Sequence, residues 1–233
     1  LEPRVAVEMM LFIQLFCFGR CTGISFIDST CVPVCHNKRI KRNKVFKGYA
    51  EIGKSTMGWY FGFKLHLICN ERGELLNFML TKANVDDRNP EVFNRLIDNV
   101  FGKLFADKGY ISQGLFERLF NDGIELVTGL KCNMKNKLMP LYDKILLRKR
   151  SVIETINDEL KNVAQLVHSR HRSVFNFAMN VLSVLVHTAS MRRSRPSTSI
   201  IASSTLMGSL LLYNKGIFSL LTTYRLPFTL VEG

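Results

Sequence analysis

Three acidic residues stand within or beside apolar segments, where a carboxylate is costly and therefore informative. Asp28 interrupts the apolar run ISFIDSTCV, Asp107 ends the short run KLFAD, and Glu154 stands within VIETI. A lone buried carboxylate costs several kcal/mol unless a partner compensates it. Each acid also has a structural interpretation: Asp28 as a strand-end or turn acid, Asp107 as a turn former before Gly109, and Glu154 as half of a surface ion pair.

If the fold brings these three side chains together, they repel each other unless a cation neutralises them. Ligand sets made only of oxygen atoms favour Mg²⁺ or Mn²⁺. Two such ions about 3.5–4 Å apart activate an attacking oxygen and stabilise a leaving one in phosphodiester chemistry. The three acids therefore predict metal-dependent chemistry on nucleic acid, on the condition that they converge.

The segment KRSVIETINDELK (149–161) reads as a helix that carries the third acid. At 3.6 residues per turn, Arg150, Glu154, Asn157 or Asp158, and Lys161 fall on one face. An i,i+4 ion pair on a solvated helix is the alternative interpretation of Arg150 and Glu154.

The elements that must position these acids follow from apolar periodicity and turn residues. Strands 60–70 and 75–81 read as an antiparallel hairpin. If the first and fourth strands are neighbours, Asp28 and Asp107 lie side by side, and a helix across them brings in Glu154. The predicted fold is α/β, a mixed five-stranded sheet flanked by helices, with strands at 23–34, 60–70, 75–81, 103–107 and 124–130 and helices at 86–100, 111–123, 149–161 and 173–186.

The two central helices carry local signals for their ends. Asn89 suits the N-cap of the first, and Pro90 suits its first helical position. Gly123 is the expected stop of the second. The second helix is amphipathic, and its inward side chains are predicted to be Leu115, Leu119 and Phe120.

Two other groups could be functional, although structural roles are favoured for both. Asp86 and Asp87 are a rival acidic pair, but their place before Asn89-Pro90 favours turn formation and capping over metal binding. Trp59 and Tyr60 are interpreted as packing residues in preference to a base-stacking platform.

The charge balance favours a polyanionic partner. Lys and Arg number 32 against 19 Asp and Glu, giving a formal net charge of +13, and 47% hydrophobic residues exclude a disordered basic tail. Residues 36–48 concentrate this charge, and phosphate contact that weakens steeply with salt is the favoured interpretation over a solvated loop. The cations of this run, with its leading histidine, are His36, Lys38, Arg39, Lys41, Arg42, Lys44 and Lys47.

The six cysteines are interpreted as reduced thiols of a cytosolic protein. Cys31-x3-Cys35-His36 with Cys17-x3-Cys21 matches zinc-ligand spacing only loosely, so zinc is not favoured. The apolar run 5–18 contains Glu8 and Gln14 and is short for a membrane span, so a core helix is favoured and no membrane partner is expected.

These segments together resemble a known family. FIDST, YFGFKLHLICNERGE, ADKGY, KRSVIETINDELK and HSRHRS resemble the DDE transposases of bacterial insertion sequences, whose catalytic domain has an RNase H-like fold; the similarity spans roughly 22–185. The family's third acid lies in a signature of Tyr, two residues, Arg, three residues, Glu, six residues and Lys. Arg150, Glu154 and Lys161 keep those intervals, whereas Leu147 replaces the Tyr.

The resemblance implies roles for individual residues. Asp28, Asp107 and Glu154 would be the catalytic residues and would bind two Mg²⁺ or Mn²⁺ ions. Arg150 and Lys161 would contact DNA phosphates near the transposon end. Further DNA contacts are predicted at Lys38, Arg39, Lys41, Arg42, His168, Arg170 and Arg172, with a helix-end basic cluster as the alternative for the last three.

The resemblance also implies an activity and a domain organisation. The expected reaction is strand cleavage at element ends followed by strand transfer to target DNA, by a homodimer in the bacterial cytoplasm at the nucleoid. The predicted regions are 1–21, the remnant of a truncated N-terminal helical region; 22–186, the catalytic domain; and 187–233, a basic, Ser-rich tail that could be frameshifted. The alternatives are an inactive fragment that binds nucleic acid non-specifically and a non-transposing nuclease of the same fold.

Overall fold

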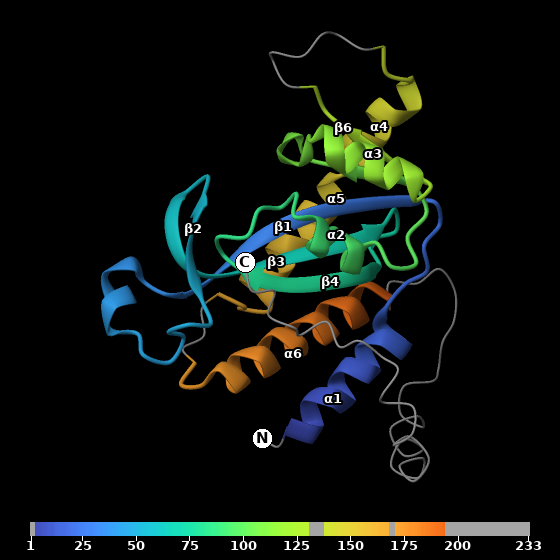
Figure 1. Ribbon diagram of the computed structural model, residues 1–233. Helices are drawn as coiled ribbons and strands as arrows, with labels where there is room; N and C mark the ends of the chain where they lie inside the picture. The colour runs from blue at the N-terminus through green and yellow to red at the C-terminus, as the bar shows by residue number, and fades with distance from the viewer. Residues whose placement is uncertain (1–2, 131–137, 168–170, 194–233) are drawn as a thin grey trace, which may run out of the picture.

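A single mixed sheet organises the computed structural model, which describes residues 3–130, 138–167 and 171–193 (Figure 1). The strand order is β2-β3-β1-β5-β6. β2 pairs with residues 58–62 of β3, and β4 pairs with residues 63–69 of the same strand. β1 is antiparallel to β3 and parallel to β5, which is parallel to β6. The strands are β1 (Ile24–Cys35), β2 (Glu51–Ser55), β3 (Gly58–Asn70), β4 (Leu75–Lys82), β5 (Gly102–Ala106) and β6 (Ile124–Thr128).

The RNase H-like α/β fold is therefore confirmed, including the hairpin of β3 with β4 and the pairing of the first and fourth predicted strands. Phe26 on β1 lies opposite Phe105 on β5. Asp28 and Asp107 each follow two residues later, so two adjacent parallel strands deliver both acids to the same edge.

The sheet has six strands because β2, which sequence reasoning missed, adds to the edge of β3. Its sequence, EIGKS, is short and mostly polar, so it lacks the apolar alternation that marks a strand. Gly53 is required there, because a Cβ atom at this position would collide with the backbone carbonyl of Ala83.

Helices cover both faces of the sheet with two hydrophobic cores. One core packs β1 and β3 against α1 (Pro3–Phe12), α5 (Ser151–Asp158) and α6 (Val174–Arg193). The other packs the opposite face against α2 (Pro90–Leu96) and α3 (Gln113–Asn121). α4 (Leu141–Lys149) lies beside β5 and β6, and α1 and α6 lie on the same side of the sheet in Figure 1.

The helix-end predictions are largely confirmed, with one error in α3. The Asn89 side chain accepts a hydrogen bond from the Glu91 N–H, and Pro90 begins α2. Gly123 follows α3 with a φ of 77°. Leu115 and Leu119 are buried, but Phe120 is 66% exposed. One residue turns the helix by about 100°, which carries Phe120 off the stripe that Leu119 shares with Leu115.

The two apolar terminal helices pack on each other. Residues 5–18 are helical as predicted, with a π-helical turn at Ile13–Cys17, and Met10, Ile13 and Cys17 are buried. α6 runs to Arg193, so the domain boundary predicted at residue 187 falls inside this helix. Its segment Val174–Arg192 is long and apolar enough to cross a membrane, but 44% of it is buried, and packing against the core accounts for its composition.

Candidate active site

The three predicted acids meet around one guanidinium group. Arg150 Nη2 lies 2.8 Å from Glu154 Oε1 and 3.9 Å from Asp107 Oδ1, and Arg150 Nη1 lies 3.8 Å from Asp28 Oδ1. Residues from β1, the end of β5 and α5 are thus brought together although they lie far apart in the chain. The ion pair of Arg150 with Glu154 exists, but it is part of this larger cluster.

Arg150 lies between two helices. The helix predicted over 149–161 is present from Ser151 onward, because α5 continues without interruption into a π-helical turn at Glu159–Val163. α4 ends at Lys149, so Arg150 is the single residue between α4 and α5. Ile153 and Ile156 are fully buried and fix α5 against the sheet. Packing of α5 on β1 and β3 therefore holds Glu154 in place beside Arg150.

Asp28 is the acid that the fold encloses most. Its side chain is 22% exposed, whereas those of Asp107 and Glu154 are 58% and 56% exposed. Burial raises the pKa of Asp28 to about 6, and the charge of Arg150 opposes this rise. The nearby carboxylates of Asp107 and Glu154 raise it further.

Asn157 is a site residue whose role sequence reasoning did not assign. Its Nδ2 donates a hydrogen bond of 2.9 Å to Asp28 Oδ2. Its Oδ1 is buried and has no hydrogen-bond partner, as is also true of Arg150 Nη1. The only signal in the sequence was its place on the same helix face as Glu154. Asp28, Glu154, Asn157 and Lys161 line one open pocket of about 280 Å³.

The three carboxylates suit a hard divalent cation, although in this structure they form ion pairs with Arg150. All three acids offer oxygen atoms, the ligands that Mg²⁺ and Mn²⁺ prefer. Within the described part of the chain, no three His, Cys, Asp or Glu side chains are grouped closely enough to hold one ion. An ion bound by these acids would compete with the Arg150 guanidinium for the same oxygens.

A second polar contact anchors the helix that precedes Arg150. Lys103 Nζ on β5 lies 2.8 Å and 2.9 Å from the two carboxylate oxygens of Asp143 on α4, and Asp143 is 3% exposed. The same amino group lies 3.5 Å from Glu125 on β6. Sequence reasoning missed this contact, because nothing in the stretch around Asp143 marks it as buried.

Comparison with known proteins decides the family. A family model described as a transposase DDE domain matches residues 18–174, more than half of the chain and a range that contains all three acids. The chain belongs to this transposase family. No curated protein matches it. A solved piggyBac transposase, in a synaptic complex with hairpin DNA, is 10% identical with a TM-score of 0.49. The match covers 83% of this chain and 52% of that one, so this chain spans about half its length.

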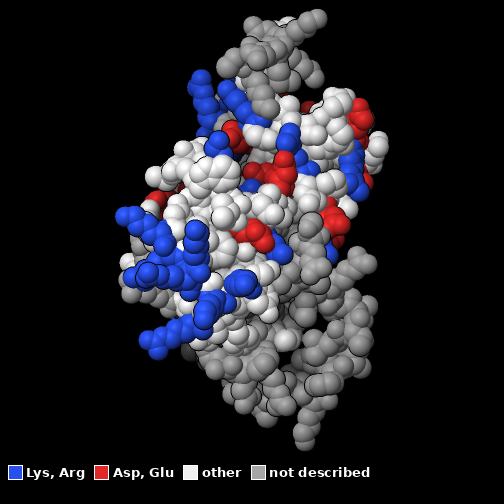
Figure 2. All heavy atoms as spheres, turned by 60° about the vertical axis from the view of Figure 1, so that its left-hand side comes forward, with Lys and Arg blue, Asp and Glu red and all other residues white. Residues whose placement is uncertain are grey.

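The predicted DNA-binding residues of the transposase domain fall into two groups. Lys38, Arg39, Lys41 and Arg42 are exposed on a 3₁₀ helix at Asn37–Arg42, and Lys44 and Lys47 follow. Figure 2 shows a dense group of basic side chains apart from the acidic ones. Arg150 instead faces the acids, and Lys161 lines the acid pocket. Arg172 is exposed, whereas His168 and Arg170 lie outside the described residues.

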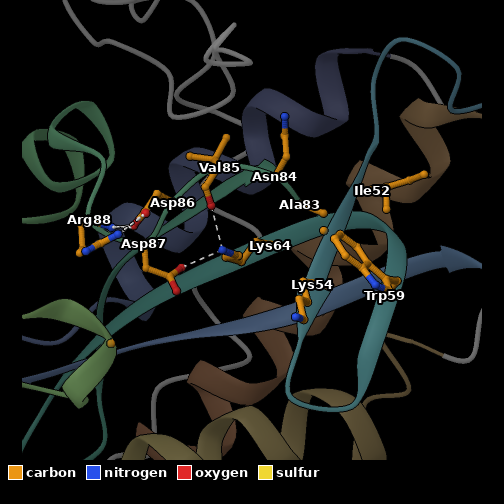
Figure 3. A pocket seen from close by; sticks show the side chains of 12 residues that line it. Ile52, Lys54, Trp59, Lys64, Ala83, Asn84, Val85, Asp86, Asp87 and Arg88 are labelled. Atoms are coloured by element: carbon orange, nitrogen blue, oxygen red, sulfur yellow. Dashed lines mark hydrogen bonds and ion pairs between the residues drawn. The ribbon is translucent and has the colours of Figure 1, made fainter. Parts of the chain in front are cut away.

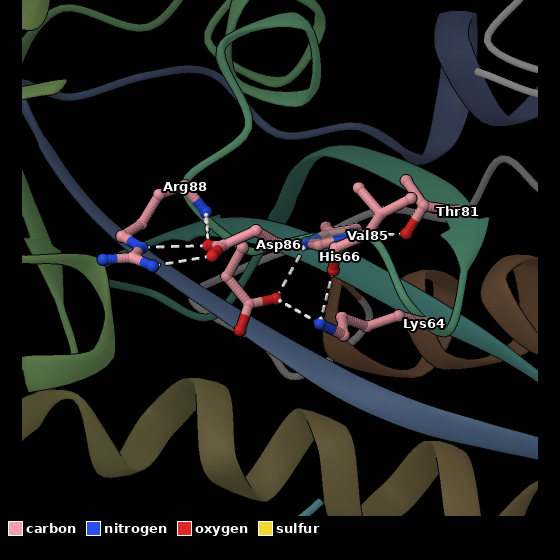
Figure 4. A network of polar contacts seen from close by, with 7 residues as sticks. Lys64, His66, Thr81, Val85, Asp86 and Arg88 are labelled. Carbon is pink, nitrogen blue, oxygen red and sulfur yellow. Dashed lines mark hydrogen bonds and ion pairs between the residues drawn. The ribbon is translucent and has the colours of Figure 1, made fainter. Parts of the chain in front are cut away.

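The rival acids have structural partners, as the turn interpretation predicts. Asp86 accepts hydrogen bonds from the backbone and side chain of Arg88. Asp87 lies 3.0 Å from Lys64 Nζ, which also donates to the Val85 carbonyl (Figure 4). Beside them lies His66, whose Nε2 is 2.9 Å from Thr81 Oγ1. Burial lowers the pKa of His66 to about 4.

Two aromatic residues beside this cluster differ in environment. Tyr60 is buried as predicted, but the packing interpretation of Trp59 is wrong, since 63% of it is exposed. Tyr110, on the segment that follows Asp107, is also buried. Burial raises the pKa of its phenol, and the charges of Asp87 and Asp28 raise it further.

Proposed function

We propose that this chain is the catalytic domain of a transposase that cuts DNA at element ends and joins the freed ends to target DNA. The convergence of Asp28, Asp107 and Glu154 on one guanidinium is the observation that carries the proposal. Membership of the DDE transposase family supports the same chemistry. Two Mg²⁺ or Mn²⁺ ions held by the three carboxylates would supply activation of the attacking oxygen and stabilisation of the leaving one.

The residues around the acids would have distinct tasks. Asn157 holds the Asp28 carboxylate in place through its amide hydrogen bond. Arg150 offsets part of the negative charge of the three acids. Once released from the carboxylates, its guanidinium is suited to bind a DNA phosphate next to the metal ligands. Lys161, on the same pocket, would bind a neighbouring phosphate.

The basic segment, residues 36–47, would supply affinity for the DNA backbone. Its cations are exposed and carry no sequence information of their own, so binding through them is expected to fall steeply with salt. Homodimer formation on DNA stays a prediction, as do the contacts of His168, Arg170 and Arg172.

The decisive experiment compares charge-removing variants in a plasmid nicking assay with Mg²⁺ or Mn²⁺. Asp107→Asn and Glu154→Gln should each lower nicking at least roughly a hundredfold, because each removes a metal ligand. DNA binding measured by gel shift should be largely unchanged. Glu117→Gln is the matched control, since Glu117 is an exposed acid on α3 whose carboxylate accepts a bond from Gln113 on the same helix.

A second measurement does not depend on activity. Electron paramagnetic resonance of Mn²⁺ should detect ions bound by the wild type and weaker binding by Glu154→Gln. Equal nicking and equal Mn²⁺ binding by the wild type and both site variants would refute the assignment.

A second candidate function is non-specific nucleic-acid binding by an inactive fragment. The exposed basic segment supports it, as does the absence of a three-acid metal group among the described residues. A salt-sensitive gel shift with no Mn²⁺ binding and no cleavage would favour this function over the first.

A further inference from the structure

An open pocket of about 460 Å³ shares no lining residue with the pocket of the acid centre (Figure 3). Its walls come from β2, from the start of β3 and from the segment that links β4 to α2. Pockets of about 300–1,000 Å³ hold small ligands. The side chains that line it are mostly polar, and those that matter here are Lys54, Trp59, Lys64, Asn84, Asp87 and Arg88.

Trp59 forms one wall and is an unusual residue to leave in solvent. It is the single Trp of the chain and is 63% exposed. Lys54 Nζ lies 5.7 Å from the centroid of its ring. The Trp59 carbonyl accepts a hydrogen bond of 2.7 Å from Asn37, the first residue of the basic 3₁₀ helix. An exposed aromatic ring beside cations is the arrangement on which proteins stack unpaired bases.

The opposite wall carries carboxylates whose charge is already balanced. Asp86 is paired with Arg88 at 2.7 Å, and Asp87 is paired with Lys64 at 3.0 Å. These pairs remove the repulsion that an anionic ligand would otherwise meet. Asn84 adds an exposed amide, which both donates and accepts hydrogen bonds as the edge of a base requires.

The backbone connects the pocket with the acid centre. Gly109 lines the pocket and lies two residues after Asp107 in the chain. A DNA strand that passes the acids at the end of β5 would therefore reach this pocket within a short distance.

We propose that this pocket binds an unpaired nucleotide of the DNA strand, with its base stacked on Trp59 and its phosphate bound by Lys54. The proposal rests on the proposed function for the identity of the strand, but the stacking itself can be measured without any cleavage. Single-stranded DNA would therefore bind more tightly than a duplex of the same sequence.

Intrinsic fluorescence gives a direct test, because all Trp emission comes from one residue. A single-stranded oligonucleotide should quench the emission of Trp59 in the metal-free protein, and a blunt duplex of the same sequence should quench it much less. Equal quenching by the two, or none by either, would overturn the proposal.

Variants of Trp59 test the same contact. Because Trp59→Ala has no Trp emission, binding is measured by the fluorescence of a single-stranded oligonucleotide that contains 2-aminopurine. Trp59→Ala should weaken single-strand binding about tenfold, the effect of losing one stacked base, whereas Trp59→Phe should retain most of it. Thr56→Ala is the matched control on the same exposed turn. Unchanged affinity of Trp59→Ala, with circular dichroism matching the wild type, would refute the assignment.

The Glu154→Gln variant separates this inference from the proposed function. Its Trp59 emission should be quenched as in the wild type although it no longer nicks DNA. Wild-type nicking by Glu154→Gln would refute the proposed function and leave the stacking result standing. Loss of quenching in Glu154→Gln would instead show that the pocket does not bind the nucleotide by itself, which contradicts the proposal.

Discussion

Two clusters of carboxylates lie near the same end of the sheet, and they differ in how their charge is balanced. In the acid centre, Asp28, Asp107 and Glu154 share the guanidinium of Arg150. In the cluster around Asp87, each acid has its own cation: Asp87 has Lys64 and Asp86 has Arg88. The first arrangement keeps an excess of negative charge around Arg150, whereas the second is neutral.

The difference separates a site that needs a ligand from a cluster that is complete. The carboxylates of Asp107 and Glu154 raise the pKa of Asp28, and carboxylates left in excess favour binding of an external cation. Carboxylates paired one to one neither attract a metal nor repel a nucleotide. The place of Asp86 and Asp87 before Asn89-Pro90 predicted a structural role for this pair, and the cation that each of them has agrees with that prediction.

The largest expected effect comes from breaking a pair in the balanced cluster. Lys64→Met should lower the free energy of unfolding by about 3–5 kcal/mol, because it leaves Asp87 without its cation in a mostly buried position. Urea unfolding measures the change. The double variant Lys64→Met/Asp87→Asn removes both charges and should recover most of the loss. A double variant as unstable as the single one would contradict this explanation.

The buried imidazole of this cluster predicts a dependence of stability on pH. The pKa of His66 is lowered to about 4 by burial, while in the unfolded chain it is near 6.5. The unfolded state therefore binds more protons between these values, and about 3 kcal/mol of stability should be lost as the pH falls from 6.5 to 4. The free energy of unfolding of His66→Gln, measured in urea, should not show this loss. The same dependence on pH in the variant and the wild type would refute the prediction.

The acid centre predicts an effect of the opposite sign. The pKa of Asp28 is raised to about 6, so its ionised form is disfavoured in the folded state. Asp28→Asn should therefore stabilise the metal-free protein by roughly 2 kcal/mol above pH 6. The gain should shrink as the pH falls from 6 through 4 and vanish below about pH 3, where the wild-type carboxyl is protonated in both the folded and the unfolded state. Thermal unfolding in the presence of a chelator measures this gain in stability. An Asp28→Asn variant that is less stable than the wild type at about pH 7.5 would contradict the prediction.

The smallest effect belongs to the exposed pair of the balanced cluster. The side chains of Arg88 and Asp86 are 45% and 55% exposed, and solvent screens their attraction. Arg88→Gln should therefore change the free energy of unfolding by about 0.5 kcal/mol or less. Urea unfolding that showed a loss comparable with Lys64→Met would mean that burial does not set the strength of these pairs.

Much of the fold could be predicted from the sequence because its strong signals are local. Apolar runs predict β1, β3 and β4, and Asn89-Pro90 predicts the start of α2. The intervals around Glu154 predicted which cations would lie near it. In these segments, local pattern and tertiary packing favour the same structure.

The rest depends on contacts between distant parts of the chain. β2 forms because the edge of β3 offers it a partner, and nothing in the sequence marks Arg150 as the residue that separates α4 from α5. The pairing of Asn157 with Asp28 spans 129 positions, so neither residue predicts the other.

The contact between Lys103 and Asp143 has a mechanical consequence. β5 leads directly into Asp107, and α4 leads directly into the joint at Arg150, so this one bridge ties the second acid to the start of the helix that bears the third. β5 and α4 would therefore move together as one rigid unit. The stretch of chain between Thr128 and Leu141 could then be lengthened or replaced during evolution, or by an engineer, while the distance between the two acids stayed the same.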